Sequence, residues 1–280
     1  LVLVDGRPVN EELGGQVVWS FLPVGIDQVH SIEIVRGPAS AMYGANAFTG
    51  VLNIVTVSPR DDREREARVV VGSLGQEAGF QTSKRSPDTA WRLRADVARI
   101  HDRVPTSSVP RPASETLRGR FAWQRTLTGE RSLHFDSGVT YGRSETLPVS
   151  VLQSLDFEGR SAFAQVRVEG PRWDAQASVR ASRFDIYPME IGFVDPIENL
   201  QTRTAYATAQ RTLSLPLGNT LVVGTDLRSL SMRSDLQVER DDFSWALFVQ
   251  DKWELGSRWI ANVGLRYDDH PLVDEEFSAR

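Results

Sequence analysis

The chain has 280 residues, of which 37 are acidic and 32 basic, so its formal net charge is −5. It contains no cysteine, which excludes disulfide scaffolds, zinc ribbons, iron–sulfur clusters and thiol nucleophiles. No apolar run approaches the roughly 20 residues of a membrane-spanning helix, so a helical membrane protein is excluded, whereas a β-barrel with alternating strands is not. The net negative charge argues against nucleic acid as a partner.

The first sixty residues predict a compact α/β unit. Strands are expected where short apolar or alternating runs are bounded by turn residues, at 1–4, 31–36 and 51–56. Between the last two strands, Gly37-Pro38 precedes a short helix at 39–43, since proline suits the first turn of a helix. Gly44 is expected to end that helix because it tolerates a left-handed cap.

The segment VHSIEIVRGPASAMYGANAFTGVLNIVT, residues 29–56, resembles the C-terminal signature of the plug domain of TonB-dependent outer-membrane receptors. VLVDGRPVN, residues 2–10, resembles an earlier plug segment. The resemblance implies that 1–60 is the C-terminal part of the plug and that 61–280 is the N-terminal half of a transmembrane β-barrel. Within the signature it gives structural roles to Gly37, Pro38, Tyr43 and Gly44.

Two charged residues of the signature have two open interpretations. By the resemblance, Glu33 and Arg36 would couple the plug to the barrel wall through a polar contact that can later yield. The alternative is a solvated strand edge, where a partly exposed ion pair contributes about 0–1 kcal/mol.

Beyond residue 66 the sequence alternates with a period of two. On one strand Trp173, Ala175, Ala177, Val179 and Ala181 share one face and Asp174, Gln176, Ser178 and Arg180 share the other. Eleven antiparallel strands are expected, near 67–73, 77–83, 90–100, 115–126, 132–142, 158–169, 173–184, 201–213, 220–232, 242–254 and 258–267.

A soluble sandwich also alternates, so three further features favour a membrane barrel. Aromatic residues occur near strand ends, where interfacial girdles form: Trp91, Trp173, Trp259, Tyr141, Phe184, Trp253 and Tyr267. The polar faces are rich in arginine and aspartate, as in a wet lumen. The connections also alternate between short and long, which places Val104, Leu147, Pro188 and Asp235 on the cell-surface side; Leu74–Gln76 breaks the rule.

The long connection 185–200 offers the candidate ligand residues Asp185, Tyr187, Phe193, Asp195 and Glu198, because aromatic rings can stack and carboxylates carry charge. The alternative is a surface loop that covers the barrel mouth. No HExxH, GxxxxGK or GxSxG motif occurs, so no catalytic residue, metal site or cofactor is predicted, and an enzyme is not expected.

The fold class expected is therefore membrane all-β: a large antiparallel barrel, about 22 strands in the full protein, with an α/β plug in its lumen, of which this chain is a fragment. By resemblance, it is a receptor of the bacterial outer membrane that takes up a ferric siderophore, cobalamin or an oligosaccharide. Its partners would be TonB, the extracellular nutrient and the membrane lipid. The alternatives are a non-transporting plugged-barrel scaffold in an envelope complex and a soluble β-rich binding domain.

Overall fold

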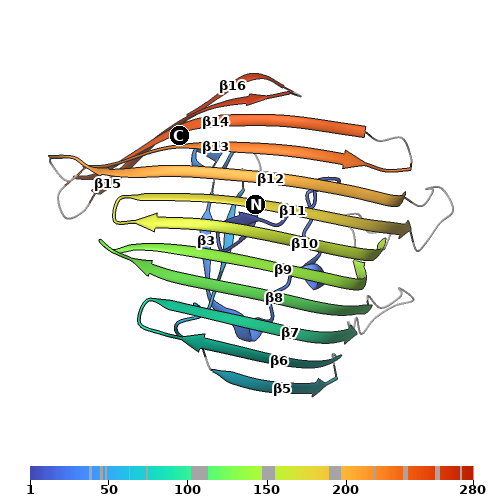
Figure 1. Ribbon diagram of the computed structural model, residues 1–280. Coiled ribbons are helices and arrows are strands. Elements are labelled where there is room, and N and C mark those ends of the chain that lie inside the picture. Colours follow the sequence, from blue (N-terminus) through green and yellow to red (C-terminus); the bar gives the residue numbers. More distant parts are fainter. Residues whose placement is uncertain are drawn as a thin grey trace.

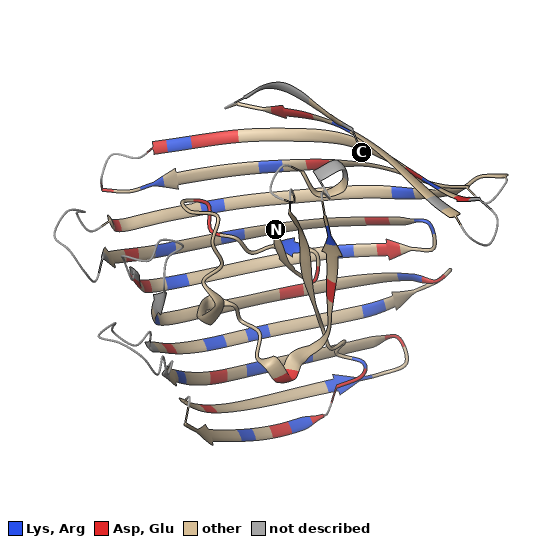
Figure 2. Cartoon of the chain, turned by 180° about the vertical axis from the view of Figure 1, so that it is seen from behind, with Lys and Arg blue, Asp and Glu red and all other residues tan. Residues whose placement is uncertain are grey.

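The computed structural model describes residues 1–37, 40–44, 47, 49–62, 64–73, 75–101, 113–146, 155–188, 197–216, 219–235, 239–255, 259–271 and 273–279. They form a four-stranded sheet of order β2-β1-β4-β3 and a twelve-stranded sheet in which β5 to β16 follow one another in sequence order. We call residues 1–57 the N-terminal unit and the twelve-stranded sheet the large sheet. The N-terminal unit lies against one face of the large sheet (Figures 1 and 2).

The N-terminal unit contains the elements that its sequence predicts. Its strands are β1 (Val2–Val4), β2 (Arg7–Pro8), β3 (Val29–Arg36) and β4 (Gly50–Thr56), and its helices are η1 (Trp19–Phe21), η2 (Ile26–Gln28) and α1 (Ser40–Tyr43). β1 pairs in parallel with β4, whose other neighbour is the antiparallel β3. Asp5 and Gly6, with φ of 48° and 79°, make the two-residue turn between β1 and β2.

The large sheet contains all eleven expected strands and one more. Their bounds are β5 (Arg65–Gly72), β6 (Gly75–Arg85), β7 (Thr89–His101), β8 (Ala113–Leu127), β9 (Arg131–Thr146), β10 (Leu155–Gly170), β11 (Trp173–Pro188), β12 (Ile197–Ser214), β13 (Asn219–Arg233), β14 (Glu239–Leu255), β15 (Trp259–His270) and β16 (Val273–Ala279). Every neighbouring pair is antiparallel, and β12 reaches 18 residues. A tilted strand needs only about 9–11 residues to cross a bilayer.

The two faces of the large sheet have opposite polarity, and the polar one is buried. On the face toward the N-terminal unit, the inner face, Arg92 and Arg120 are 1% and 4% exposed. On the outer face, Val69 and Val97 are 75% and 51% exposed. A soluble sandwich has the reverse arrangement, so this sheet is built to meet water inside and lipid outside.

The strands are joined alternately at two opposite edges of the sheet (Figure 1). The connections 128–130, 171–172, 215–218 and 256–258 are short and define the turn side; the connections 102–112, 147–154, 189–196 and 234–238 are longer and define the loop side. Two short connections, 73–74 and 271–272, also lie on the loop side. Val104 and Leu147 lie outside the described residues, whereas Pro188 and Asp235 are at the loop side, as predicted.

Within the described residues, no helix has the length and hydropathy to cross a membrane.

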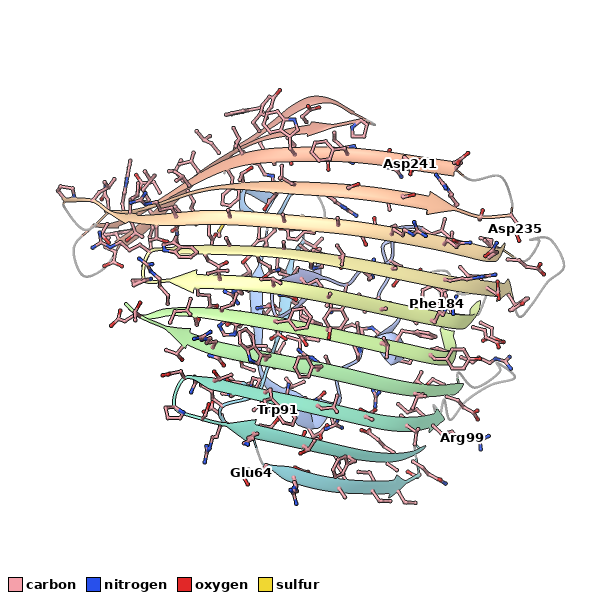
Figure 3. The ribbon with its side chains drawn as sticks, viewed as in Figure 1. Glu64, Trp91, Arg99, Phe184, Asp235 and Asp241 are labelled. Carbon is pink, nitrogen blue, oxygen red and sulfur yellow. The ribbon has the colours of Figure 1, made fainter. Side chains whose placement is uncertain are left out.

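One aromatic assignment is wrong. Phe184 was expected among the interfacial aromatics, but it is 2% exposed and lies on the inner face of β11 (Figure 3). It packs edge-on against Phe21 of η1, with ring centroids 4.9 Å apart, and against Phe157 of β10, at 6.0 Å. The reason is parity, because Phe184 shares its face with Gln176 and Ser182 rather than with Val179.

Candidate functional site

The main candidate site is the interface between the N-terminal unit and the inner face of the large sheet. Asp5, at the tip of the β1–β2 hairpin, is its central carboxylate. Its Oδ2 accepts hydrogen bonds from Arg120 of β8 and from the Thr56 hydroxyl, both at 2.8 Å, and its Oδ1 accepts one from the Thr56 amide at 2.8 Å. Arg120 also pairs with Asp136 of β9, so one buried guanidinium joins the hairpin tip to two neighbouring strands.

The adjoining residue of the hairpin, Arg7, is held by an aromatic ring. Its guanidinium lies 3.8 Å from the centroid of Phe163 on β10, a cation–π arrangement. Burial lowers the pKa of Arg7 to about 9 from its ordinary value, and the neighbouring Arg180 and Arg120 add to that effect. Arg7 therefore brings a buried positive charge of the hairpin against the inner face of the large sheet.

The segment after the hairpin brings two glutamates to the strands β11 and β13. Arg180 of β11 donates to Glu11 at 3.0 Å and to the carbonyl oxygen of Asn10 at 2.8 Å. Arg228 of β13 pairs with Glu12. Burial raises the pKa of Glu11, against the opposing charge of Arg180.

A third carboxylate, Asp27 of η2, meets two arginines of the large sheet. Arg94 of β7 donates to its two oxygens at 2.5 and 3.1 Å, and Arg68 of β5 lies 3.0 Å away. Burial alone would raise the pKa of Asp27, but the hydrogen bonds and charges of Arg94 and Arg68 outweigh it and lower the pKa.

The ion pairs described between the two parts share one polarity: carboxylates from the N-terminal unit meet arginines from the large sheet. Figure 2 shows the basic bands that recur along the strands behind the unit. Water can solvate both partners of a charged pair once they part. The interface also has an apolar part, in which Val18 and Phe21 pack with Phe184 and its neighbours. Chemically, the ion pairs are suited to a contact that holds the N-terminal unit on the inner face and can be broken by exchange with water.

The sequence predicted this coupling for Glu33 and Arg36, which the structure places elsewhere. Both are exposed on β3, the edge strand of the small sheet, and Glu33 accepts a hydrogen bond at 2.9 Å from Asn53 of the adjacent β4. Within the described residues, neither has a hydrogen bond or ion pair to the large sheet. Their coupling role stays a prediction.

The structural residues of the signature lie around α1. Gly37 and Gly44 have φ of 84° and 77°, the left-handed region that favours glycine. Tyr43 packs against the cluster of Leu3, Ala47 and Val51. Pro38 lies outside the described residues.

The predicted ligand residues are only partly described. The Asp185 carboxylate accepts a hydrogen bond from the backbone N–H of Asn199 at 2.6 Å, and the side-chain amide of Asn199 donates to Asp235 at 3.1 Å. Asp185 therefore links the loop-side ends of β11 and β12. Tyr187 and Glu198 are exposed, whereas Phe193 and Asp195 lie outside the described residues. Ligand contact by these residues remains a prediction, and the described part of the chain holds no cluster of three or more metal-binding side chains.

A cavity of about 870 Å³ lies between the N-terminal unit and strands β10 to β15. Its lining is rich in paired charges, among them Arg266, which donates to Asp226 at 2.7 Å. Alternation in the sequence places these arginines on polar strand faces. It does not identify their partners, because paired residues lie as many as 216 positions apart in the chain.

Comparisons with known proteins agree with this geometry. Residues 1–51 match the family described as the TonB-dependent receptor plug domain. A vitamin B12 transporter of Vibrio vulnificus is 36% identical over 85 residues, covering 30% of this chain and 14% of the relative. The ferric enterobactin receptor of Pseudomonas aeruginosa is 41% identical over an alignment 360 positions long, which covers 99% of this chain and 48% of the relative.

Solved structures extend the agreement to the fold. The crystal structure of a G324V mutant of the ferric enterobactin receptor from Pseudomonas aeruginosa superposes with a TM-score of 0.70, covering all of this chain and 50% of that one. The superposed residues are 19% identical, so the superposition shows a shared fold alone. The relationship to this receptor rests on the sequence alignment, at 41% identity. The chain spans about half the length of the ferric enterobactin receptor, both in the sequence alignment and in the superposition.

Proposed function

From this chain's membership of the TonB-dependent receptor family, whose members lie in the bacterial outer membrane, we propose that it belongs to a receptor that takes up a scarce nutrient. The N-terminal unit would be the C-terminal part of the plug, residues 1–60, and 61–280 the first half of the barrel. The cargo would be a ferric siderophore or cobalamin, the classes in the names of the relatives. No chemical change of the nutrient is part of this role.

The observation that carries the proposal is the charged seal between the N-terminal unit and the large sheet. Asp5, Glu11 and Asp27 reach arginines of the large sheet from three separate places. Such pairs hold the plug in place at rest and can be exchanged for water when work is applied. The energy for that work would come from the inner membrane through TonB, because ligand binding alone cannot supply net uphill transport.

A reversible tether tests whether the plug must move. The Ser20 hydroxyl of η1 donates a hydrogen bond of 2.5 Å to the Ser144 hydroxyl of β9, so the two side chains point toward each other, as the partners of a disulfide must. The double variant Ser20→Cys/Ser144→Cys is made in the full-length receptor, with any cysteine outside this cysteine-free chain replaced by serine.

Uptake of labelled ferric enterobactin and of cobalamin is then measured in a strain that lacks the native gene. We expect uptake of one cargo to stop under oxidising conditions and to recover with dithiothreitol, while each single-cysteine variant transports under both conditions. Full uptake by the oxidised, tethered receptor would contradict plug movement. Uptake of neither cargo by the unaltered receptor would contradict the proposed cargo classes.

A further inference from the structure

Three arginines stand together on the outer face of the large sheet, near the loop side. Arg160 of β10 lies directly opposite Arg183 of β11, and Arg203 of β12 is two residues from the position that pairs with Arg183. All three are exposed, and none forms an ion pair with any residue in the described part of the chain. We call these residues the arginine triad.

Other outer-face arginines near the loop side are neutralised. Arg99 pairs with Glu115 at 2.8 Å, Arg143 with Asp156, and Arg233 with Glu239 at 3.2 Å. Like charges placed directly opposite each other on neighbouring strands are destabilising unless something compensates them. The nearest carboxylates on this face, Glu158 and Asp185, lie opposite each other two residues from Arg160 and Arg183, and within the described residues neither forms an ion pair with the triad. The triad is therefore a group of neighbouring arginines without ion-pair partners near the loop side.

Below the triad, toward the turn side, the outer face is hollowed. A groove of about 380 Å³ crosses strands β10 to β14, and its lining surface is almost entirely apolar. Four alanines line the groove, Ala164, Ala177, Ala205 and Ala207. Larger apolar side chains line it beside them, namely Val166, Val179, Leu227 and Phe243. From Arg160 to Ala164 is four residues, or roughly 13 Å along a strand at about 3.4 Å per residue.

The triad and the groove together match an amphiphile with an anionic head and an apolar chain. Guanidinium groups bind phosphate through paired hydrogen bonds, and the groove lies on a face that meets the hydrocarbon layer. We propose that this surface binds a lipid of the membrane leaflet on the loop side whose phosphate head carries a net negative charge. Its phosphate sits among Arg160, Arg183 and Arg203, and an acyl chain fills the groove over Ala205.

The proposal is tested on the full-length receptor in detergent micelles, to which phosphatidic acid or phosphatidylcholine is added. Bound lipid is counted by native mass spectrometry. The test variants are the triple change Arg160→Gln/Arg183→Gln/Arg203→Gln and the groove-filling change Ala205→Phe. Their matched controls are Arg211→Gln, an exposed outer-face arginine near the turn side, and Ala95→Phe, an exposed outer-face alanine of β7 outside the groove.

We expect the unaltered receptor and both controls to retain phosphatidic acid roughly tenfold more than phosphatidylcholine, the scale of one charge-assisted interaction. The triple variant should lose that preference, and Ala205→Phe should weaken retention, with circular dichroism showing that each variant is folded. Retention by the triple variant, or equal loss in Arg211→Gln, overturns the proposal. Displacement of the lipid by inorganic phosphate together with full retention by Ala205→Phe also overturns it, because the site would then bind a free anion.

Discussion

Individual arginines of the inner face do more than coat a wet lumen. Arg120 is 4% exposed and forms ion pairs with both Asp5 and Asp136, so one buried side chain joins the N-terminal unit to the large sheet. Arg99 makes a comparable pair with Glu115 on the outer face, but both side chains of that pair are more than 60% exposed. Burial therefore decides which of these pairs matters for stability.

The variant Arg120→Gln should lower the free energy of unfolding by about 3–5 kcal/mol, because it leaves the carboxylates of Asp5 and Asp136 without their buried partner. Chemical denaturation of the detergent-solubilised receptor measures the loss. Arg99→Gln is the control and should cost about 0–1 kcal/mol. Equal losses in the two variants would show that burial of the pair does not set its contribution.

The lowered pKa of Asp27 gives its contact a defined pH dependence. Its carboxylate is favoured in the folded state, so the contribution to stability is complete above the ordinary pKa of about 3.9 and is lost as the pH falls through the lowered folded value. The stability difference between the unaltered receptor and Asp27→Asn should therefore shrink as the pH falls from about 6 to 3, as followed by denaturant midpoints.

Glu11 supplies the opposite sign as an internal check. Its pKa is raised, so its ionised form is disfavoured in the folded state, and its contribution falls as the pH rises through the raised value. The free energy of unfolding of the unaltered receptor should therefore fall relative to that of Glu11→Gln as the pH rises. Parallel pH trends for the two variants would contradict the assigned environments.

Only one member of each of these ion pairs can be predicted from the sequence. Alternation alone identified Arg94 and Arg180 as members of polar strand faces, since parity depends only on near neighbours. It could not name Asp27 and Glu11 as their partners, because those contacts depend on how the N-terminal unit is seated. The family signature drew attention to Glu33 instead, whose hydrogen-bonded partner in the structure is its neighbour Asn53.

At the scale of elements, the strand β9 lacks a side chain at one place where the N-terminal unit lies against it. A Cβ atom on Gly138 would lie 2.6 Å from the ring of Phe163 and 3.1 Å from Pro23 of the N-terminal unit. The missing side chain thus lets the loop around Pro23 lie directly on the strand. Periodicity predicted that β9 exists, but it gave no reason for a glycine at this point.

The variant Gly138→Val should push the N-terminal unit away from β9 and destabilise the folded state by about 1–3 kcal/mol, the usual cost of overpacking. Faster cleavage of the N-terminal unit by trypsin would report the displacement. Gly119→Ala is the matched control, since the nearest side-chain atom to its added Cβ would be Val139 Cγ2 at 3.4 Å, and it should be cleaved like the unaltered receptor. Unchanged cleavage of Gly138→Val would contradict the close approach.

The elements themselves were largely predictable, and the reason is physical. A strand with lipid on one side and water on the other must alternate, so strands such as β11 and β14 show their period in the sequence. Their ends were less predictable: β12 runs to 18 residues, well beyond the expected 201–213. Phe184 is a separate case: its position near a strand end suggested an interfacial aromatic, although the alternation continues through it and places it on the inner face.

At the scale of the whole molecule, the large sheet is inverted relative to a soluble protein. Its buried face carries arginine, aspartate and glutamine, and its exposed face carries valine, leucine and aromatic residues. Water inside and lipid outside satisfy both faces, and the N-terminal unit occupies the polar side. The charged seal, the lipid-facing groove and the arginine triad all follow from that single inversion.

The most direct test of this inversion is cysteine scanning along β11, since this chain has no cysteine of its own. Single cysteines replace residues 175 to 181 in the full-length receptor in membranes, and labelling is compared between a water-soluble and a lipid-soluble maleimide. The account predicts that Ala177, Val179 and Ala181 positions react with the lipid-soluble reagent alone. Positions 176, 178 and 180 should resist it, and should react with the water-soluble reagent once the N-terminal unit is deleted. Labelling without a period of two, or with the two faces exchanged, would contradict the account.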